Sequence, residues 1–524
     1  MRLLVSCLVF HLLLSLVFLS FPLQVFSLHR SHLFPRNASA APATTTNLTL
    51  EFSTYFGGSK DTELGLAITS APDGSFYVTG QTTSSDFPHT TDAFDSSYNG
   101  GTDTFLAKFA ADGRLLWSTF FGGSDFDSGF SVATSSDGSC YIAGSTRSAD
   151  FPTKNAYSSN YTGTEDVFLA KFSPRGKLLW STYLGGMDWD FCLSIAVAAD
   201  GSCYVGGETE SHDFPTTTNA FGRVFVGGYF DAFVTKFSTD GDLLWSTYLG
   251  GTYNDGGWSV SLAGDGSCYV TGWTASFDFP TSPQAYDRTL NGDWDVFLTK
   301  FSADGAFLWS TYLGGFGWDQ GTAVAAAPDG SCYLTGFTAS FDFPTLQAFN
   351  STYGNWGDAF VAKFSADGAL LWSTFFGGTG AEWALALTAT RIGCYLTGHT
   401  FSRNFPVKRA FDSTYNGGYE DAFVSKFATN GSLLWSTYLG GRGGEEAAGI
   451  AVNREGRCFV IGSTDSTNFP LQQAFDPTLG SSKDAFISIF IEPTTPIKYH
   501  ALFGFFVLVS VTFLAVLIYP RKKY

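Results

Sequence analysis

The sequence has little positive charge. Lys and Arg total 29 against 47 Asp and Glu, which gives a formal net charge of −18 and a pI near 4.7. A nucleic-acid-binding protein needs a basic surface that neutralises phosphates, and the sequence shows none. We therefore expect no nucleic-acid partner, whereas the acidic composition is compatible with solubility, cation binding or cationic partners.

Residues and motifs typical of catalysis are also scarce. Only three of the 7 His residues, His89, His212 and His399, fall between residues 48 and 491, and they are far apart in the sequence. No Gly-x-Ser-x-Gly elbow, zinc-ligand pair or phosphate-binding loop occurs. We therefore expect a protein that is not an enzyme.

Aromatic residues and glycine are abundant instead. The chain has 54 Phe, 23 Tyr, 13 Trp and 59 Gly, and 44% of its residues are hydrophobic. This combination is typical of many short strands joined by tight turns around a large core.

The N-terminus is typical of a secreted protein. Met1-Arg2 and an apolar run as far as about Phe26 indicate a signal peptide over 1–27, followed by a linker over 28–47. Cleavage near Ser27 and cleavage near the Ala38-Ser39-Ala40 stretch are both compatible with the sequence.

The C-terminus carries a candidate membrane anchor. Residues 501–519 are uncharged and, as a helix, would span about 28 Å, close to the hydrocarbon thickness of a bilayer. The basic tail 520–524 favours the cytoplasmic side, and 492–500 form a short juxtamembrane linker. We predict a single-pass protein of the cell membrane with an extracellular body.

Glycosylation-type sequons agree with an external body. They begin at Asn37, Asn47, Asn160, Asn350 and Asn430.

Three signatures recur at intervals of 62 to 65 residues. The first is Trp-Ser-Thr-aromatic-Leu/Phe-Gly-Gly, which starts at Trp117, Trp180, Trp245, Trp309, Trp372 and Trp435, with Phe52 opening a seventh copy. The second is Asp-x-Phe-x-x-Lys-Phe, which starts at Asp103, Asp166, Asp231, Asp295, Asp358 and Asp421, with a copy lacking Lys at Asp484. The third is Asp/Asn-Phe-Pro, which starts at Asp86, Asp150, Asp213, Asp278, Asp342, Asn404 and Asn468. Each signature therefore occurs seven times.

Each unit reads as four strands with Gly-containing turns, which is the pattern of a propeller blade. The three signatures resemble the seven-bladed β-propeller (SBBP) repeat family of bacterial and archaeal surface proteins, over about residues 48–491. The resemblance implies an all-β fold, namely a seven-bladed β-propeller with four-stranded blades, to which the C-terminal span adds one transmembrane helix. It implies little about function, because propellers have many roles.

The two ends of the repeat region are complementary. It begins with a fourth strand and ends with a third, so the N-terminal strand is expected to complete the last blade and close the ring. Strand parity places the Asp-Gly turns on one face and the Asp/Asn-Phe-Pro and post-Gly-Gly loops on the other, the top face. We expect the top face to point away from the membrane.

Each unit has one carboxylate where its innermost strand should begin. One interpretation is a ring at the channel mouth that binds Ca²⁺ or a cationic partner. The other is that each carboxylate accepts backbone N–H groups within its own loop. The seven residues are Glu63, Asp127, Asp190, Asp255, Asp319, Glu382 and Glu445. No cofactor is certain, and Ca²⁺ is a possible one.

Seven Trp residues lie outside the recurring signature. We interpret them as ligand-binding candidates on or next to the top-face connections, with packing between blade tops as the alternative. They are Trp189, Trp258, Trp273, Trp294, Trp318, Trp356 and Trp383.

Two functions are compatible with these features. The first is a membrane-anchored binding or structural protein that holds a glycan or a protein on its top face. The alternative is an extracellular carbohydrate-active hydrolase or lyase that uses two top-face carboxylates, which requires a pair at a defined separation with one raised pKa.

Overall fold

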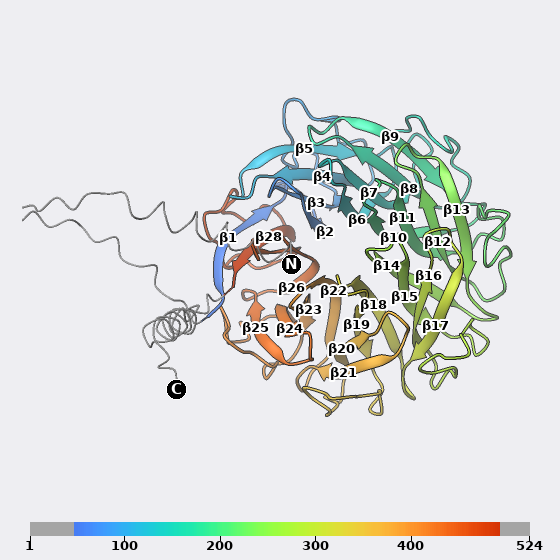
Figure 1. The fold of residues 1–524 in the computed structure, drawn as a ribbon. Coiled ribbons are helices and arrows are strands. Elements are labelled where there is room, and N and C mark those ends of the chain that lie inside the picture. The colour runs from blue at the N-terminus through green and yellow to red at the C-terminus, as the bar shows by residue number, and fades with distance from the viewer. Residues whose placement is uncertain (1–46, 493–524) are drawn as a thin grey trace, which may run out of the picture. The chain divides into compact units, whose positions relative to one another are not determined.

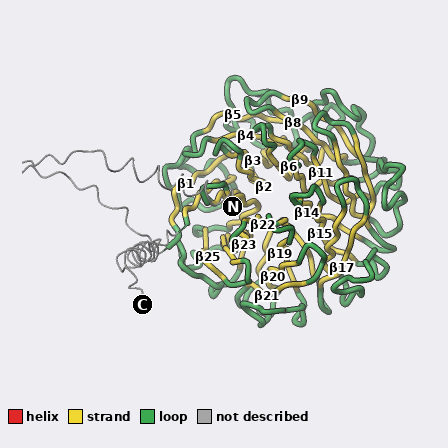
Figure 2. The backbone as a smooth tube through the Cα atoms, in the orientation of Figure 1, coloured by secondary structure: helices red, strands yellow, loops and turns green. Residues whose placement is uncertain are grey.

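The computed structural model describes residues 47–492, which form seven four-stranded antiparallel sheets around a central channel (Figure 1). This part of the chain consists of strands and loops (Figure 2), and none of it forms a helix able to cross a membrane. The predicted signal peptide, most of the linker, the 501–519 span and the basic tail lie outside the described residues.

The strands of each blade occupy equivalent positions, counted from the channel outward. The innermost strands are β2 (Glu63–Ser70), β6 (Asp127–Thr134), β10 (Asp190–Val197), β14 (Asp255–Leu262), β18 (Asp319–Ala326), β22 (Glu382–Thr390) and β26 (Glu445–Val452). The second strands are β3 (Phe76–Thr82), β7 (Cys140–Thr146), β11 (Cys203–Thr209), β15 (Cys268–Thr274), β19 (Cys332–Thr338), β23 (Gly393–Thr400) and β27 (Cys458–Thr464). The third strands are β4 (Asp103–Phe109), β8 (Asp166–Phe172), β12 (Asp231–Phe237), β16 (Asp295–Phe301), β20 (Asp358–Phe364), β24 (Asp421–Ala428) and β28 (Asp484–Ile491). The outermost strands are β5 (Leu115–Phe121), β9 (Leu178–Leu184), β13 (Leu243–Leu249), β17 (Phe307–Leu313), β21 (Leu370–Phe376), β25 (Leu433–Leu439) and β1 (Thr49–Phe56).

The ring is closed by the N-terminal strand, as the sequence predicts. The seventh blade has the order β26-β27-β28-β1, so β1 is its outermost strand. β1 pairs with β28 from Thr49 opposite Ile491 to Phe56 opposite Ala485. The pairing removes an exposed sheet edge, which would otherwise be a site of aggregation.

The core lies between adjacent blades. The signature Trp of one blade crosses to the third-to-fourth turn of the next. Trp180 Nε1, for example, donates a hydrogen bond to the carbonyl of Thr239 at 3.0 Å, and its indole packs on Gly241. All seven Cys residues in the described part of the chain are buried free thiols, which agrees with a packing role.

Each innermost strand contains a bulge that turns one side chain into the channel. In β14 the pairing with β15 shifts between Gly257 and Ser259, so Trp258 is left unpaired and lines the channel. The equivalent residues of the other blades are Leu66, Phe130, Leu193, Thr322, Leu385 and Ala448.

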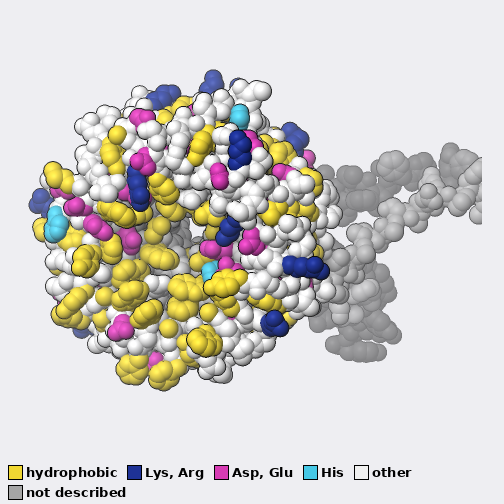
Figure 3. Space-filling view, turned by 180° about the vertical axis from the view of Figure 1, so that it is seen from behind, with side chains coloured by type: hydrophobic (Ala, Val, Ile, Leu, Met, Phe, Trp, Pro, Cys, Tyr) yellow, Lys and Arg dark blue, Asp and Glu magenta, His cyan; other side chains and the backbone are white. Residues whose placement is uncertain are grey.

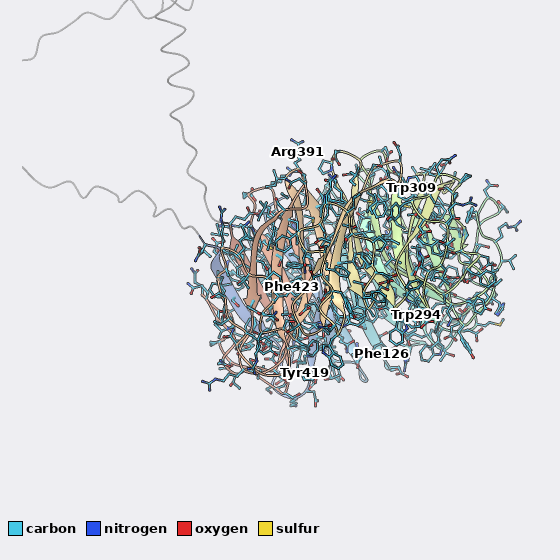
Figure 4. The ribbon with its side chains drawn as sticks, turned by 90° about the horizontal axis from the view of Figure 1, so that it is seen from below. Phe126, Trp294, Trp309, Arg391, Tyr419 and Phe423 are labelled. Carbon is cyan, nitrogen blue, oxygen red and sulfur yellow. The ribbon has the colours of Figure 1, made fainter. Side chains whose placement is uncertain are left out.

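The two faces of the ring differ as strand parity predicts. Phe126, Trp294 and Tyr419, from the long connections, lie on one face, and Arg391, from a first-to-second turn, lies on the other (Figure 4). The short Asp-Gly turns therefore lie opposite the long loops that form the top face.

Candidate functional site

The top rim of the channel is built on a repeated backbone frame. In several junctions an isolated parallel bridge joins the residue before a blade's third strand to the residue before the next blade's innermost strand. These bridges are Thr62–Lys483, Thr102–Phe126, Glu165–Trp189 and Trp294–Trp318. The backbone geometry of these bridges repeats, whereas their side chains differ. We call this rim the channel mouth. It is the candidate site because its side chains do not follow the repeat.

The seven predicted ring carboxylates lie beneath this rim, inside the blade junctions. All seven residues have 0% exposed surface. Asp190 is typical: its Oδ2 accepts hydrogen bonds from the Gly186 N–H at 2.7 Å and from Ser211 Oγ at 2.9 Å. The carboxylates therefore hold the Gly-Gly loop against their own blade, and a ligand in the channel would not contact them.

Each of these carboxylates faces a second one from the preceding blade. Gly185 separates Asp190 from Asp166, the first residue of β8, and a Cβ placed on Gly185 would lie 2.7 Å and 2.6 Å from their nearest oxygens. Burial raises the pKa of Asp190 to about 7 and that of Asp166 to about 6, and the charge of Asp166 adds to the shift of Asp190. In residues 47–492 no three His, Cys, Asp or Glu side chains are grouped so that they could hold a metal ion.

Three of the seven candidate Trp residues are brought together at the fourth and fifth blades. The ring centroids of Trp273 and Trp294 are 4.5 Å apart, and those of Trp294 and Trp318 are 5.5 Å apart, both stacked. Trp273 is buried, whereas Trp318 is 53% exposed and donates from Nε1 to Asp293 Oδ2 at 3.2 Å. We call these three residues the tryptophan stack.

The other four candidates are not part of this stack. Trp189 is 37% exposed and lies 5.3 Å from the Arg147 guanidinium, and Trp356 is 77% exposed. Trp383 stacks on Phe337 with ring centroids 4.0 Å apart. Trp258 lines the channel, because the bulge in β14, which strand parity does not reveal, turns it inward.

Charged groups occupy another part of the mouth, at the sixth and seventh blades. His399 Nε2 lies 3.7 Å from Glu420 Oε2, and both side chains are about 15% exposed or less. Burial and the repulsion of Glu446 raise the pKa of Glu420 to about 7, although Lys483 opposes this shift. Burial and the Lys483 charge lower the pKa of His399 to about 4, so this imidazole is neutral at pH 7.

A further carboxylate lies beside the tryptophan stack. Glu208, in β11, is partly buried. Burial and the negative charge of Glu210 raise its pKa to about 7. A Cβ placed on Gly256 would lie 2.7 Å from Glu208 Oε2 and would also collide with Trp273 Nε1. Glu208 and Trp273 therefore meet across a residue that has no side chain.

Figure 3 views the molecule from behind Figure 1 and so shows the face that carries Phe126, Trp294 and Tyr419. Hydrophobic side chains gather on one side of the central hollow, and a group of acidic, basic and His side chains borders its other side, with further charged side chains nearer the outer edge of the hydrophobic side. The mouth therefore has an aromatic arc and a charged arc, in contrast to the sevenfold symmetry of the backbone.

The charged arc and Glu208 were not predicted from the sequence. These residues belong to no motif, and the available signal was their departure from the repeat: His399 and Glu208 stand where other blades have Gln81 and Ser145. Of the predicted glycosylation sites, Asn47, Asn160 and Asn430 are exposed and Asn350 is partly exposed, whereas Asn37 lies outside the described residues.

Comparisons with known proteins agree with the fold. Residues 434–470 match the family model of the SBBP β-propeller repeat. The regulatory protein FlaEY of Caulobacter vibrioides is 26% identical over 415 residues, covering 73% of this chain and 41% of that protein. An uncharacterised WD repeat-containing protein of Acanthamoeba polyphaga mimivirus is 23% identical over 439 residues, covering 67% of this chain and 31% of its own length. The chain thus spans less than half the length of these two relatives.

A solved structure of a Dyadobacter fermentans protein of unknown function aligns with a TM-score of 0.40 at 10% identity, covering 85% of this chain and 99% of that one. Nothing about function follows from a likeness at this level. The three recurring signatures, the seven four-stranded blades and the match at 434–470 together identify the chain as a seven-bladed β-propeller built from SBBP repeats.

Proposed function

We propose that this protein is a membrane-anchored binding protein of the cell surface that holds a glycan across the channel mouth on its top face. The support is the contrast between repeated and varied positions. Residues at the repeated positions are engaged in the scaffold, as the buried Asp190 and the hydrogen bond from Trp180 to the Thr239 carbonyl show. The tryptophan stack does not recur, and Trp318 is 53% exposed at its end, so the scaffold does not account for it.

The chemistry of the mouth favours a glycan over a protein. Stacked indoles offer flat apolar faces of the kind that pack against sugar rings, and Glu208 and Glu420 offer acceptors for hydroxyl groups nearby. The core of a protein–protein interface is instead usually depleted of Glu and Asp. A protein ligand is therefore the less favoured occupant, and an array test separates the two.

The orientation also supports this proposal. β28 ends at Ile491, which pairs with Thr49 of β1. This end of the strand lies on the face of the ring away from the long loops. Only the sequence 492–500 separates this point from the predicted span at 501–519. A short tether on that face would direct the channel mouth away from the membrane.

The test is a glycan array probed with the full-length chain in detergent, compared with Trp318→Ala. We expect binding to a related group of glycans that Trp318→Ala weakens at least about tenfold. Leu244→Ala is the control, because Leu244 is 50% exposed on the outer strand β13, away from the mouth. A blank array with the wild-type chain, or equal binding by Trp318→Ala, would count against the proposal.

A hydrolase or lyase is a second candidate function, and one observation favours it. Glu420 has a raised pKa and lies next to Glu446 and His399, which is the pattern of an acid paired with a base. The seven buried ring carboxylates cannot serve, since a substrate cannot reach them. Release of shorter oligosaccharides from an array-positive glycan, lost in Glu420→Gln, would support this function, and an intact glycan after long incubation would reject it.

A further inference from the structure

Equivalent positions in neighbouring blades contact one another at the mouth in two of the blade junctions. The penultimate residue of a second strand faces the second residue of the next blade's innermost strand. Gln81 Oε1 accepts a hydrogen bond from Ser128 Oγ at 2.8 Å in one junction. Phe337 stacks on Trp383 in another. In these two junctions the side chain at the first position contacts the side chain at the second.

The junction between the third and fourth blades departs from this arrangement. Glu208 occupies the first position and Gly256 the second, so the carboxylate has no matching side chain. Within residues 47–492 the partly exposed Glu208 side chain makes no hydrogen bond and no ion pair. The nearby charge is that of Glu210, which is of the same sign.

The indole of Trp273 also lies next to Gly256. Trp273 is the buried end of the tryptophan stack, and its Nε1 edge and the Glu208 carboxylate approach the same point above Gly256. A carboxylate without a counter-charge can pair with an ammonium group. The exposed indole of Trp318, at the other end of the stack, offers a face against which a sugar ring can pack.

We propose that the glycan held at the channel mouth carries a free ammonium group, which Glu208 receives at the edge of the tryptophan stack. This inference rests on the proposed glycan-binding function and specifies the class of glycan. A neutral sugar would leave the carboxylate without a counter-charge. An anionic sugar would meet repulsion from Glu208 and Glu210.

The test uses two oligosaccharides with the same backbone: a β-1,4-linked glucosamine tetramer and its fully N-acetylated form. Calorimetric titration of the full-length chain in detergent is expected to show at least tenfold tighter binding of the amine form at pH 6.5. Glu208→Gln should abolish that preference and leave the affinity for the acetylated tetramer within twofold. Glu455→Gln, which removes an exposed carboxylate of a first-to-second turn, is the charge-matched control.

Equal or tighter binding of the acetylated tetramer, or an unchanged preference in Glu208→Gln, would overturn the inference while leaving glycan binding intact. If neither tetramer binds although the glycan array is positive, the inference about the ammonium group is wrong and the proposed glycan binding still holds. A blank array removes the proposed function as well.

Discussion

The carboxyl groups of Asp166 and Asp190 lie on either side of Gly185, buried between the second and third blades. Their raised pKa values, about 6 and about 7, predict how stability depends on pH. In the unfolded chain both groups titrate near 3.8. The folded state therefore binds more protons between about pH 4 and 7, and its stability falls as pH rises through that window.

Similar pairs recur at the other junctions, for example Asp103 with Asp127 and Asp231 with Asp255. We expect the melting temperature to fall by at least roughly 5 °C between pH 5 and pH 8. Scanning calorimetry across this range measures the effect. A melting temperature that is constant or rises over the same range would contradict it.

Asp190→Asn should make this pH dependence weaker. The amide oxygen can still accept from the Gly186 N–H, and the amide nitrogen can donate to Asp166 Oδ1, which has no hydrogen-bond partner among the described residues. At pH 8 we expect a melting temperature equal to or above that of the wild type. Asp137→Asn is the control, because the pKa of this turn residue is lowered by hydrogen bonds from Ser135 and Ser139 and it adds nothing to the slope above pH 5.

The sequence predicts the position of these carboxylates in the blade and, as one of two interpretations, their bonds to backbone N–H groups, but not the second carboxylate beside each. The repeat places Asp190 at the start of an innermost strand, which is correct. Its neighbour Asp166 comes from the preceding blade, and only the ring geometry brings the two together. Trp258 shows the same limit, since a one-residue bulge turns it into the channel, and strand alternation assumes regular pairing.

The fold itself was more predictable, because each of its determinants is local or repeated. The Trp-Ser-Thr and Asp-Phe-Pro signatures define the blades, and the half-blades at 48 and 491 define closure. The Glu208–Gly256 pairing was not predictable, since it joins positions 48 residues apart in neighbouring blades and neither residue belongs to a signature.

The glycines under the signature Trp residues should be sensitive to substitution. Gly241 has a φ of +92°, and a Cβ there would lie 3.0 Å from Trp180 Cδ2. We expect Gly241→Ala to lower the free energy of unfolding by about 1–3 kcal/mol through backbone strain and displacement of the indole. Gly264→Ala, at a turn glycine with no atom within 4 Å of the added Cβ, should change it by less than about 0.5 kcal/mol. Equal changes in the free energy of unfolding for the two variants, measured by chemical denaturation, would show that the packing of Trp180 on the turn does not require glycine.

The predicted membrane topology can be tested on intact cells. Protease treatment should degrade an epitope inserted in the exposed loop at Asn160 and spare a tag placed after Tyr524. In permeabilised cells both epitopes should be lost, which controls for tag accessibility. Loss of the C-terminal tag from intact cells would show the opposite orientation.

Ring closure by β1 can be tested with a disulfide between the first and last strands. Ser53 and Ser488 are buried and opposite each other, with their Oγ atoms 2.9 Å apart, so Ser53→Cys with Ser488→Cys is expected to oxidise into a crosslink. The positions are separated by 435 residues, so the crosslink would convert nearly the whole propeller into one covalent loop. On a denaturing gel without reductant, the closed loop should migrate faster than the reduced chain.

A matched pair in the sixth blade separates loop closure from the local effect of the new bond. Ser425 and Ser436 occupy the same blade positions with their Oγ atoms 2.7 Å apart, but they are only 11 residues apart in the chain. Because loop-closure entropy grows with the logarithm of loop length, the Ser53–Ser488 crosslink should stabilise the fold by about 3 kcal/mol more than the Ser425–Ser436 crosslink. If the Cys residues at 53 and 488 stay free thiols while those at 425 and 436 form a disulfide, β1 does not occupy the last blade in solution. A crosslink between positions 53 and 488 with the larger stabilisation would show that β1 pairs with β28 in solution and closes the ring.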